Sequence, residues 1–228
     1  MAFWRRRDGA KRRRFGCLPI FLTVLILMIL LIVIIAWPRA MPQSETLPAA
    51  VAAPRPVPLR TVQSFAGIAD TDQRSVALFT EAGRVIQHPR CLNCHPRTDS
   101  PTQTDAMRPH SPAMARGADG LGLPTLRCST CHHDANFAAS GVPGNPKWRL
   151  APIEMAWQGK SLSEICKQLL DPGRSHMSRE ELLHHMAHDD LVGWAWHPGG
   201  DRTPAPGTQQ QFGALIDAWL KTGAKCPS

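Results

Sequence analysis

The chain has 228 residues and a formal net charge of +8 at pH 7, which at first suggests an anionic partner. The charge is unevenly distributed, because seven basic residues and one acidic residue lie in the opening "MAFWRRRDGAKRRRFG". The rest of the chain holds 19 basic and 17 acidic side chains, a net charge of only +2. A nearly balanced body lacks the basic surface that nucleic-acid binding requires, so we expect no nucleic-acid partner.

An uncharged apolar run, "LPIFLTVLILMILLIVIIAW" at residues 18–37, follows the basic segment 1–17. About 20 apolar residues in a helix match a bilayer's hydrocarbon core, so the run predicts a transmembrane anchor. The arginines before it predict a cytoplasmic N-terminus, a single pass through a bacterial inner membrane and a periplasmic domain. A cleaved signal peptide is the alternative, although the run is longer than usual for one and "AWPRA" is a poor cleavage site.

A proline-rich stretch follows the apolar run. Residues 38–60 contain six prolines and little periodic apolar pattern. Proline at this density favours an extended, semi-rigid conformation, so the stretch is predicted to be a stalk. The folded domain is then expected over residues 61–228.

Within that domain, apolar residues recur at helical spacing in several stretches. Asp72 is predicted to cap a helix through "TDQRSVALFTEAGRVIQ", which ends before Pro89. The capping box that opens a helix is matched by "SLSE" at 161–164 and by "SREE" at 178–181. A further helix is expected in "TQQQFGALIDAWLKTG", with Gly223 as its C-terminal stop.

Little regular structure is expected between residues 96 and 150, which are rich in Pro, Gly, Asp and Ser. No run in the chain alternates convincingly with the period of two that a half-buried strand requires. The predicted fold class is therefore mainly α with extensive coil, with one N-terminal transmembrane helix and one small domain. A domain with this much coil is expected to fold partly around a bound group, and not only around its own side chains.

The signature Cys-x-x-Cys-His occurs twice, as "CLNCH" at 91–95 and "CSTCH" at 128–132. In haem c attachment both thiols are bonded to the porphyrin and the adjacent histidine binds iron on the proximal side. With seven Cys and ten His in the chain, about 0.01 such matches are expected by chance. The sequence therefore predicts two covalently bound haem c groups. The predicted attachment residues are Cys91, Cys94, Cys128 and Cys131, and the predicted proximal ligands are His95 and His132.

Two other uses of these cysteines stay open. Zinc could be bound by the two Cys-x-x-Cys pairs, although the matched histidines would then have no role. A thioredoxin-like redox pair would explain one motif and not the second.

Through the two motifs and the "ALFTEAG" stretch before the first, the chain resembles the c-type cytochromes. It is also similar to small anchored dihaem proteins labelled as subunits of isoquinoline-1-oxidoreductase-type molybdenum hydroxylases. The stretches that carry this second resemblance are "HPRCLNCHP", "WRLAPIEMAW", "LVGWAWHPGG" and "FGALIDAWLKTGAKCP", within residues 75–227. The resemblance implies a dihaem cytochrome c domain that accepts electrons from a molybdenum hydroxylase.

Two cysteines of the exported part, Cys166 and Cys226, remain after the motifs are assigned. Unpaired thiols tend to be oxidised outside the cytoplasm, so a disulfide between these two is expected. It would close a loop of about 60 residues. Two buried free thiols are the alternative.

Each haem iron has a sixth coordination position, which His or Met fills in a closed site. The candidates, not assigned to either iron, are His88, His110, His133, Met155 and His185. His133 follows the proximal His132 directly, so its side chain is expected to point away from that haem and to be available to the other. Because only 37 positions separate the motifs, we expect two six-coordinate haems in close contact.

The sequence thus predicts a membrane-tethered periplasmic dihaem c-type cytochrome. Such a protein relays electrons between a dehydrogenase or membrane complex and an acceptor, and has no catalytic residues of its own. A peroxidase-like dihaem oxidoreductase with one open iron is the alternative. A haem-based sensor is a third interpretation, although the segment before the apolar run is too short to hold an output domain.

Overall fold

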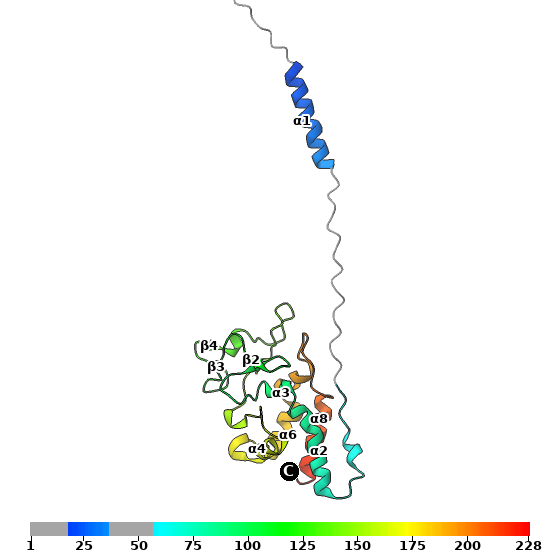
Figure 1. Ribbon diagram of the computed structural model, residues 1–228, viewed down its shortest axis with the longest axis vertical. Coiled ribbons are helices and arrows are strands. Elements are labelled where there is room, and N and C mark those ends of the chain that lie inside the picture. Colours follow the sequence, from blue (N-terminus) through cyan, green and yellow to red (C-terminus); the bar gives the residue numbers. More distant parts are fainter. Residues whose placement is uncertain (1–17, 37–56) are drawn as a thin grey trace, which may run out of the picture. The chain divides into compact units, whose positions relative to one another are not determined.

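The computed structural model describes residues 18–36 and 57–228 (Figure 1). The predicted basic segment 1–17 and most of the predicted stalk lie outside these residues. The chain divides into two compact units, residues 1–50 and 51–228, and each is described by itself.

The described part of the N-terminal unit is the helix α1 (Leu18–Ala36), which forms where the apolar run predicts a helix. Its large apolar side chains between Phe21 and Ile35 are exposed. No helix among the described residues is long and apolar enough to cross a membrane. The transmembrane part of the predicted fold class, placed at residues 18–37, is therefore wrong.

The second unit is mainly helical with long stretches of coil. Its α-helices are α2 (Thr71–Ile86), α3 (Pro89–Leu92), α4 (Leu162–Leu170), α5 (Pro172–Ser175), α6 (Arg179–His188), α7 (Asp190–Gly193) and α8 (Gln209–Lys221). Its 3-10 helices are η1 (Val62–Phe65), η2 (Cys128–Thr130), η3 (Ile153–Met155) and η4 (Trp194–Trp196).

Helix α8 is the centre of the helical core, and it packs against α2 on one side and α6 on the other (Figure 1). Trp219 of α8 is fully buried against Phe79 of α2, with ring centroids 4.5 Å apart. The contact with α6 requires glycine at position 213, because a Cβ there would lie 2.5 Å from the Cβ of Ala187. Close backbone approach and aromatic packing thus hold the three helices together.

Helix ends follow the local sequence closely. At α4, the Ser161 hydroxyl accepts from the Glu164 N–H at 3.2 Å while the Glu164 carboxylate accepts from the Ser161 N–H at 2.8 Å. Ser178 and Glu181 form the same pair of bonds at α6, at 3.2 and 2.8 Å. Both predicted capping boxes are confirmed.

At α2 the predicted cap is corrected by two residues. The Asp70 carboxylate accepts from the Gln73 N–H at 2.7 Å, whereas Asp72 lies inside the first turn. A carboxylate two residues earlier has the geometry to reach the free N–H groups of that turn. Helix α8 ends at Lys221, and Gly223 follows it with φ of 101°, so the predicted glycine stop is confirmed.

A disulfide joins Cys166, in the buried face of α4, to Cys226 near the chain end, with a Cα–Cα distance of 5.6 Å. This confirms the predicted pairing and excludes the two free thiols. The bond closes a loop of 60 residues between α4 and the segment that follows α8.

The coil between residues 96 and 150 contains two short antiparallel hairpins. Strand β1 (Thr102–Gln103) pairs with β2 (Arg108–Pro109), and β3 (Gly122–Leu123) pairs with β4 (Leu126–Arg127). These hairpins and the coil around them lie to one side of the helical core (Figure 1). Two-residue strands agree with the absence of alternating sequence in this region.

Candidate functional site

The two Cys-x-x-Cys-His motifs fold into the same backbone turn, one in α3 and the following residues and one in η2. In the first, the His95 N–H donates to the Cys91 carbonyl at 3.1 Å. In the second, the His132 N–H donates to the Cys128 carbonyl at 2.9 Å. The second cysteine of each motif bonds to the same carbonyl, at 3.1 and 3.2 Å. One turn therefore presents two thiols and an imidazole together in each motif.

A backbone carbonyl orients the histidine of each motif. His95 Nδ1 lies 2.7 Å from the Met155 carbonyl oxygen, and His132 Nδ1 lies 2.7 Å from the Pro143 carbonyl oxygen. A carbonyl oxygen can only accept, so Nδ1 carries the proton in both rings and Nε2 keeps a free lone pair. This is the tautomer and the second-shell bond that a metal-binding histidine needs.

A tryptophan stacks on each of these rings. Trp157 lies parallel to His95, with centroids 3.5 Å apart and planes at 6°. Trp148 lies nearly parallel to His132, with centroids 4.5 Å apart and planes at 13°. The two sites therefore share one arrangement, or plan, in which a backbone carbonyl and a tryptophan ring hold the histidine of the motif in place.

Burial keeps both histidines neutral near pH 7. It lowers the pKa of His95 to about 3, against the opposing effect of the Met155 carbonyl. It also lowers the pKa of His132, against the opposing effect of the Pro143 carbonyl. Neutral imidazole is the form that binds a metal ion.

The motif thiols are unpaired, and burial keeps three of them protonated. Burial raises the pKa of Cys91 to about 12 and that of Cys94 to about 11, and it also raises the pKa of Cys128. Cys131 is exposed. Among the residues that the structure describes, no group of three or more His, Cys, Asp or Glu lies close enough together to hold a metal ion. The two cysteine pairs therefore do not form the four-thiolate cluster of the zinc alternative.

A cavity of about 650 Å³ connects the two motifs. Its wall includes Cys94 from the first motif and Cys128, Cys131 and His132 from the second. This volume lies within the range of cofactor and ligand pockets. Five arginines also line it, against the two acids Asp105 and Asp201: Arg90, Arg108, Arg127, Arg149 and Arg202. The wall is therefore suited to a group that carries carboxylates.

Three buried donor atoms have no hydrogen-bond partner in the described structure: Arg90 Nε, Arg116 Nε and Trp157 Nε1. Buried polar atoms rarely remain unpaired. Arg90 is 3% exposed, lines the cavity and pairs with Asp105, while Trp157 stacks on His95. The Arg90 donor thus lies on the cavity wall beside the first motif, where a propionate of a bound haem would satisfy it, whereas Trp157 does not line the cavity. The residues present fit that group.

The predicted distal candidates are placed differently from one another. His110 lies on the cavity wall, with its ring centroid 6.0 Å from that of His132. His133 is exposed and does not line the cavity. Met155 is buried in the core and its carbonyl binds His95 Nδ1, so this residue lies behind the ring, away from Nε2.

The two remaining candidates lie on the side of the first motif. His88 caps α3 by accepting from the Arg90 N–H at 3.3 Å, and its pKa is lowered chiefly by burial. His185 on α6 also has a pKa lowered chiefly by burial, and it is near enough to His95 to lower the pKa of that ring.

Several residues of the site were not predicted. Arg90, Arg116 and the carbonyl of Pro143 have no distinguishing sequence pattern. Arg90 does stand directly before the first motif cysteine, and this position is the one signal that could have identified it.

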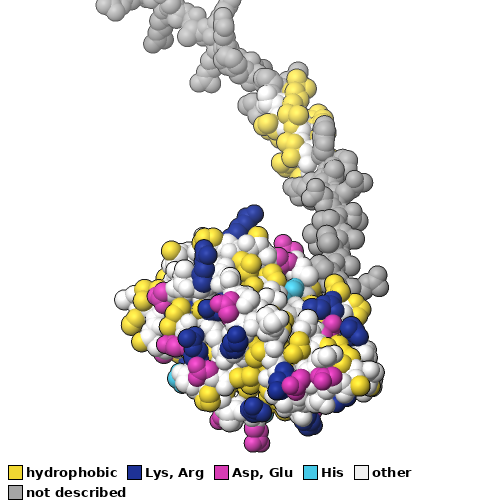
Figure 2. Space-filling view, turned by 60° about the horizontal axis from the view of Figure 1, so that its bottom comes forward, with side chains coloured by type: hydrophobic (Ala, Val, Ile, Leu, Met, Phe, Trp, Pro, Cys, Tyr) yellow, Lys and Arg dark blue, Asp and Glu magenta, His cyan; other side chains and the backbone are white. Residues whose placement is uncertain are grey.

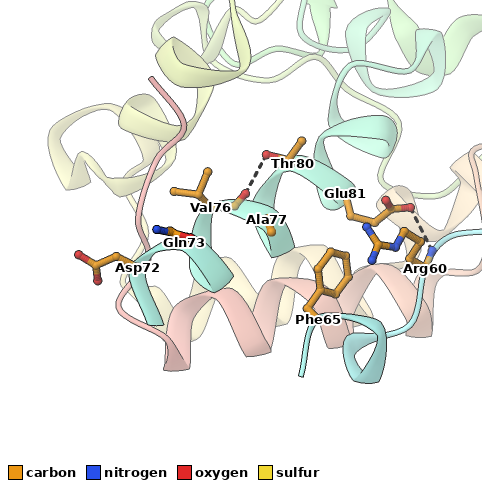
Figure 3. A pocket seen from close by; sticks show the side chains of 8 residues that line it. All are labelled: Arg60, Phe65, Asp72, Gln73, Val76, Ala77, Thr80 and Glu81. Atoms are coloured by element: carbon orange, nitrogen blue, oxygen red, sulfur yellow. Dashed lines mark hydrogen bonds between the residues drawn. The ribbon is translucent and has the colours of Figure 1, made fainter. Parts of the chain in front are cut away.

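A second pocket, of about 540 Å³, lies on the surface of α2 and η1 (Figure 3). Its wall includes Arg60, whose guanidinium lies 4.3 Å from the centroid of the Phe65 ring, and Glu81, which accepts from the Arg60 N–H at 3.0 Å. Figure 3 shows no cysteine or histidine in this wall, so the pocket is separate from the motif sites.

On the face drawn in Figure 2, basic side chains alternate with acidic ones and form no single patch. Comparison with models of protein families, with curated proteins and with solved structures finds no match to this chain. The functional argument therefore depends on the geometry of the motif sites.

Proposed function

We propose that this chain is an exported dihaem c-type cytochrome that transfers electrons. Cys91 and Cys94 would hold one haem c and Cys128 and Cys131 the other, with His95 and His132 as the proximal ligands. The observation that carries this proposal is the repeated plan of the two motif sites, each with its turn, its carbonyl-bound histidine and its stacked tryptophan. A turn that served only packing would not need the same histidine arrangement twice.

Bound haem supplies one-electron redox chemistry, and the residues of the chain hold and tune it. The carbonyls of Met155 and Pro143 keep Nε2 of each histidine free and increase its basicity as a ligand. Burial keeps His95 neutral, so no proton competes for Nε2 near pH 7. The chain thus provides the ligand geometry before any haem is attached.

The arginines of the cavity wall are suited to the carboxylates of the cofactor. Arg90 is buried and keeps one nitrogen, Nε, without a partner. A guanidinium can bind a carboxylate through two nitrogens at once, so this residue has the capacity to hold a propionate as well as Asp105. In this role Arg90 positions the cofactor and takes no part in electron chemistry.

The shared cavity supports the proposal of an electron relay. Because cysteines of both motifs line one cavity, the two haems would lie close together and exchange electrons directly. We propose that electrons enter from a redox protein and leave to a separate acceptor. A molybdenum hydroxylase is the donor that the sequence resemblance suggests. The disulfide between Cys166 and Cys226 supports an oxidising compartment such as the periplasm.

Haem content measures the proposal directly. The chain would be produced in a bacterial host with haem c maturation enzymes, and the pyridine haemochrome would be used to count haems per chain. We expect two haems in the native chain. We expect one in Cys91→Ala/Cys94→Ala and one in Cys128→Ala/Cys131→Ala.

The control variant is Cys166→Ala/Cys226→Ala, which removes the same number of cysteines outside the motifs, here the disulfide-bonded pair, and should keep two haems. A colourless native protein, or pigment that acidic acetone extracts, would show that no covalent haem is present. Zinc in place of iron by metal analysis would contradict the proposal in the same way.

A further inference from the structure

His110 faces His132 across the cavity that connects the two motifs. The ring centroids are 6.0 Å apart and the ring planes make an angle of 60°. Both residues line the cavity wall. His110 belongs to the coil after β2, so it reaches the second motif from the segment that joins the two motifs.

The two rings are oriented in the same way by backbone carbonyls. His110 Nδ1 lies 2.8 Å from the Pro112 carbonyl oxygen, as His132 Nδ1 lies 2.7 Å from that of Pro143. Since a carbonyl only accepts, Nδ1 is the protonated atom of His110 as well. Its Nε2 is therefore free to bind a metal ion.

The separation of the rings matches that of two axial ligands on one metal ion. Two metal–nitrogen bonds of about 2 Å each, with the radii of the two rings, place the centroids about 6 Å apart. Stacked rings lie closer than this, as the 3.5 Å between His95 and Trp157 shows, whereas edge-to-face pairs have centroid distances in the same range. The angle between the ring planes is not restricted, because each ring can rotate about its own bond to the metal.

A short hairpin fixes the position of His110. The His110 N–H donates to the Pro101 carbonyl at 3.2 Å, which extends the β1–β2 pairing by one bond. The hairpin is in turn attached to the first motif through Asn93. This side chain accepts from the Thr102 hydroxyl at 2.7 Å and donates to the Thr104 carbonyl at 3.0 Å. Asn93 is a central residue of "CLNCH", so the first motif holds the segment that carries His110 to the second.

Other residues near the second motif are placed less well for the same role. Trp148 covers the face of the His132 ring and does not approach it along Nε2. His133 is exposed and lies off the cavity wall. Met114 lines the cavity, so its thioether is the competing ligand.

We infer that His110 is the distal axial ligand of the haem iron that His132 binds, which makes this site a bis-histidine centre. The inference rests on the proposed function and assigns one ligand of the site that it describes. Asn93 is then a positioning residue, since it would set the ligand of the second haem from within the motif of the first.

Carbon monoxide binding by the reduced, haem-loaded chain tests the assignment, because the gas needs an open axial position. The variant His110→Ala should bind one more carbon monoxide per chain than the native protein, and should gain a high-spin ferric signal in its EPR spectrum. Added imidazole should abolish both changes. The matched control, His133→Ala, should behave as the native protein does.

The haem count separates this test from that of the proposed function. If the native chain carried no covalent haem, the proposed function would be contradicted. Two haems with no new carbon monoxide binding in His110→Ala would overturn the ligand assignment alone. New carbon monoxide binding in Met114→Leu, and not in His110→Ala, would also overturn the ligand assignment.

If His110→Ala loads only one haem, the variant His110→Met decides the question. A methionine at this position should add a near-infrared band of His/Met ligation to the spectrum of the native protein. If His110→Met shows the native spectrum, the assignment is wrong.

Discussion

The two motif sites share one plan but are built in different surroundings. The first is packed against the helical core, where Trp157 is 5% exposed and burial lowers the pKa of His95 to about 3. The second lies in coil, where Cys131 is exposed and Trp148 is only half-buried. The comparison shows that the turn geometry is local to the five-residue motif, whereas protection from solvent depends on neighbouring elements.

In the proposed dihaem protein, this difference in burial would affect the reduction potentials of the two haems. Burial disfavours the additional positive charge of ferric iron, so the first haem should have the higher reduction potential. If His110 binds the second haem as inferred, bis-histidine ligation would also keep the potential of that haem low, since it lacks the thioether that raises potentials. The second, more exposed site would then exchange electrons with the partner, and the first would be the internal one.

The largest expected effect comes from the disulfide, which supports the first site. Helix α4 follows Trp157 within a few residues and carries Cys166. The variant Cys166→Ser/Cys226→Ser should reduce the free energy of unfolding by about 4 kcal/mol, because a loop of 60 residues becomes unconstrained in the unfolded chain. Denaturant unfolding measures this loss. A loss below about 1 kcal/mol would show that the loop is held by other contacts.

The stacked tryptophans sharpen the comparison. Trp157→Ala should reduce the free energy of unfolding by about 3 kcal/mol, because it removes a buried ring from a packed site. Trp148→Ala should cost about 1 kcal/mol, because solvent can fill part of the space. The two variants are matched in chemistry, so equal losses in denaturant unfolding would contradict the difference in packing.

Asn136 tests whether the second site depends on contacts with the helical region. Its side chain accepts from the Gly144 N–H at 3.0 Å and from the Trp194 indole at 2.9 Å, and donates to the His197 carbonyl at 2.9 Å. Asn136→Ala should lower stability by about 2 kcal/mol and alter the spectrum of the second haem alone. The control Gln158→Ala, which removes a 3.3 Å bond from the Arg97 N–H, acts on the first side. A change in the first haem with Asn136→Ala would contradict this separation.

The smallest effect is expected at the caps. Ser161→Ala should cost about 1 kcal/mol, because α4 loses the hydroxyl that accepts from the Glu164 N–H. The matched variant Ser178→Ala should cost the same at α6. Thermal unfolding of both variants compares the two helices. Neither should change the haem count, since both caps are exposed and lie away from the cavity.

The fold was predictable where local rules determine it. Capping boxes, the glycine stop and the Cys166–Cys226 pair each follow from a few neighbouring residues or from the cysteine count. An apolar helix over residues 18–37 was also predicted and forms at Leu18–Ala36, but its role as a transmembrane anchor was wrong, since no helix among the described residues is long and apolar enough to cross a membrane.

The candidate site was predictable only in part, for a physical reason. A five-residue motif specifies its own turn, so Cys91 and His132 could be identified from sequence. The carbonyls of Met155 and Pro143 lie 60 and 11 residues from the histidines that they orient, and any residue type can supply a carbonyl. From the sequence, the distal ligands of the two irons could be limited to five candidates, and His110 could be proposed for the second haem only from its distance to His132.

Intact-mass spectrometry of the matured chain under denaturing acid is the most direct test of the central claim. Only thioether-bonded haem survives these conditions, so the account predicts a mass increase equal to two haems on every fully matured chain. The bare polypeptide mass would contradict it. So would a mass increase of only one haem that remains when either pair of motif cysteines is replaced.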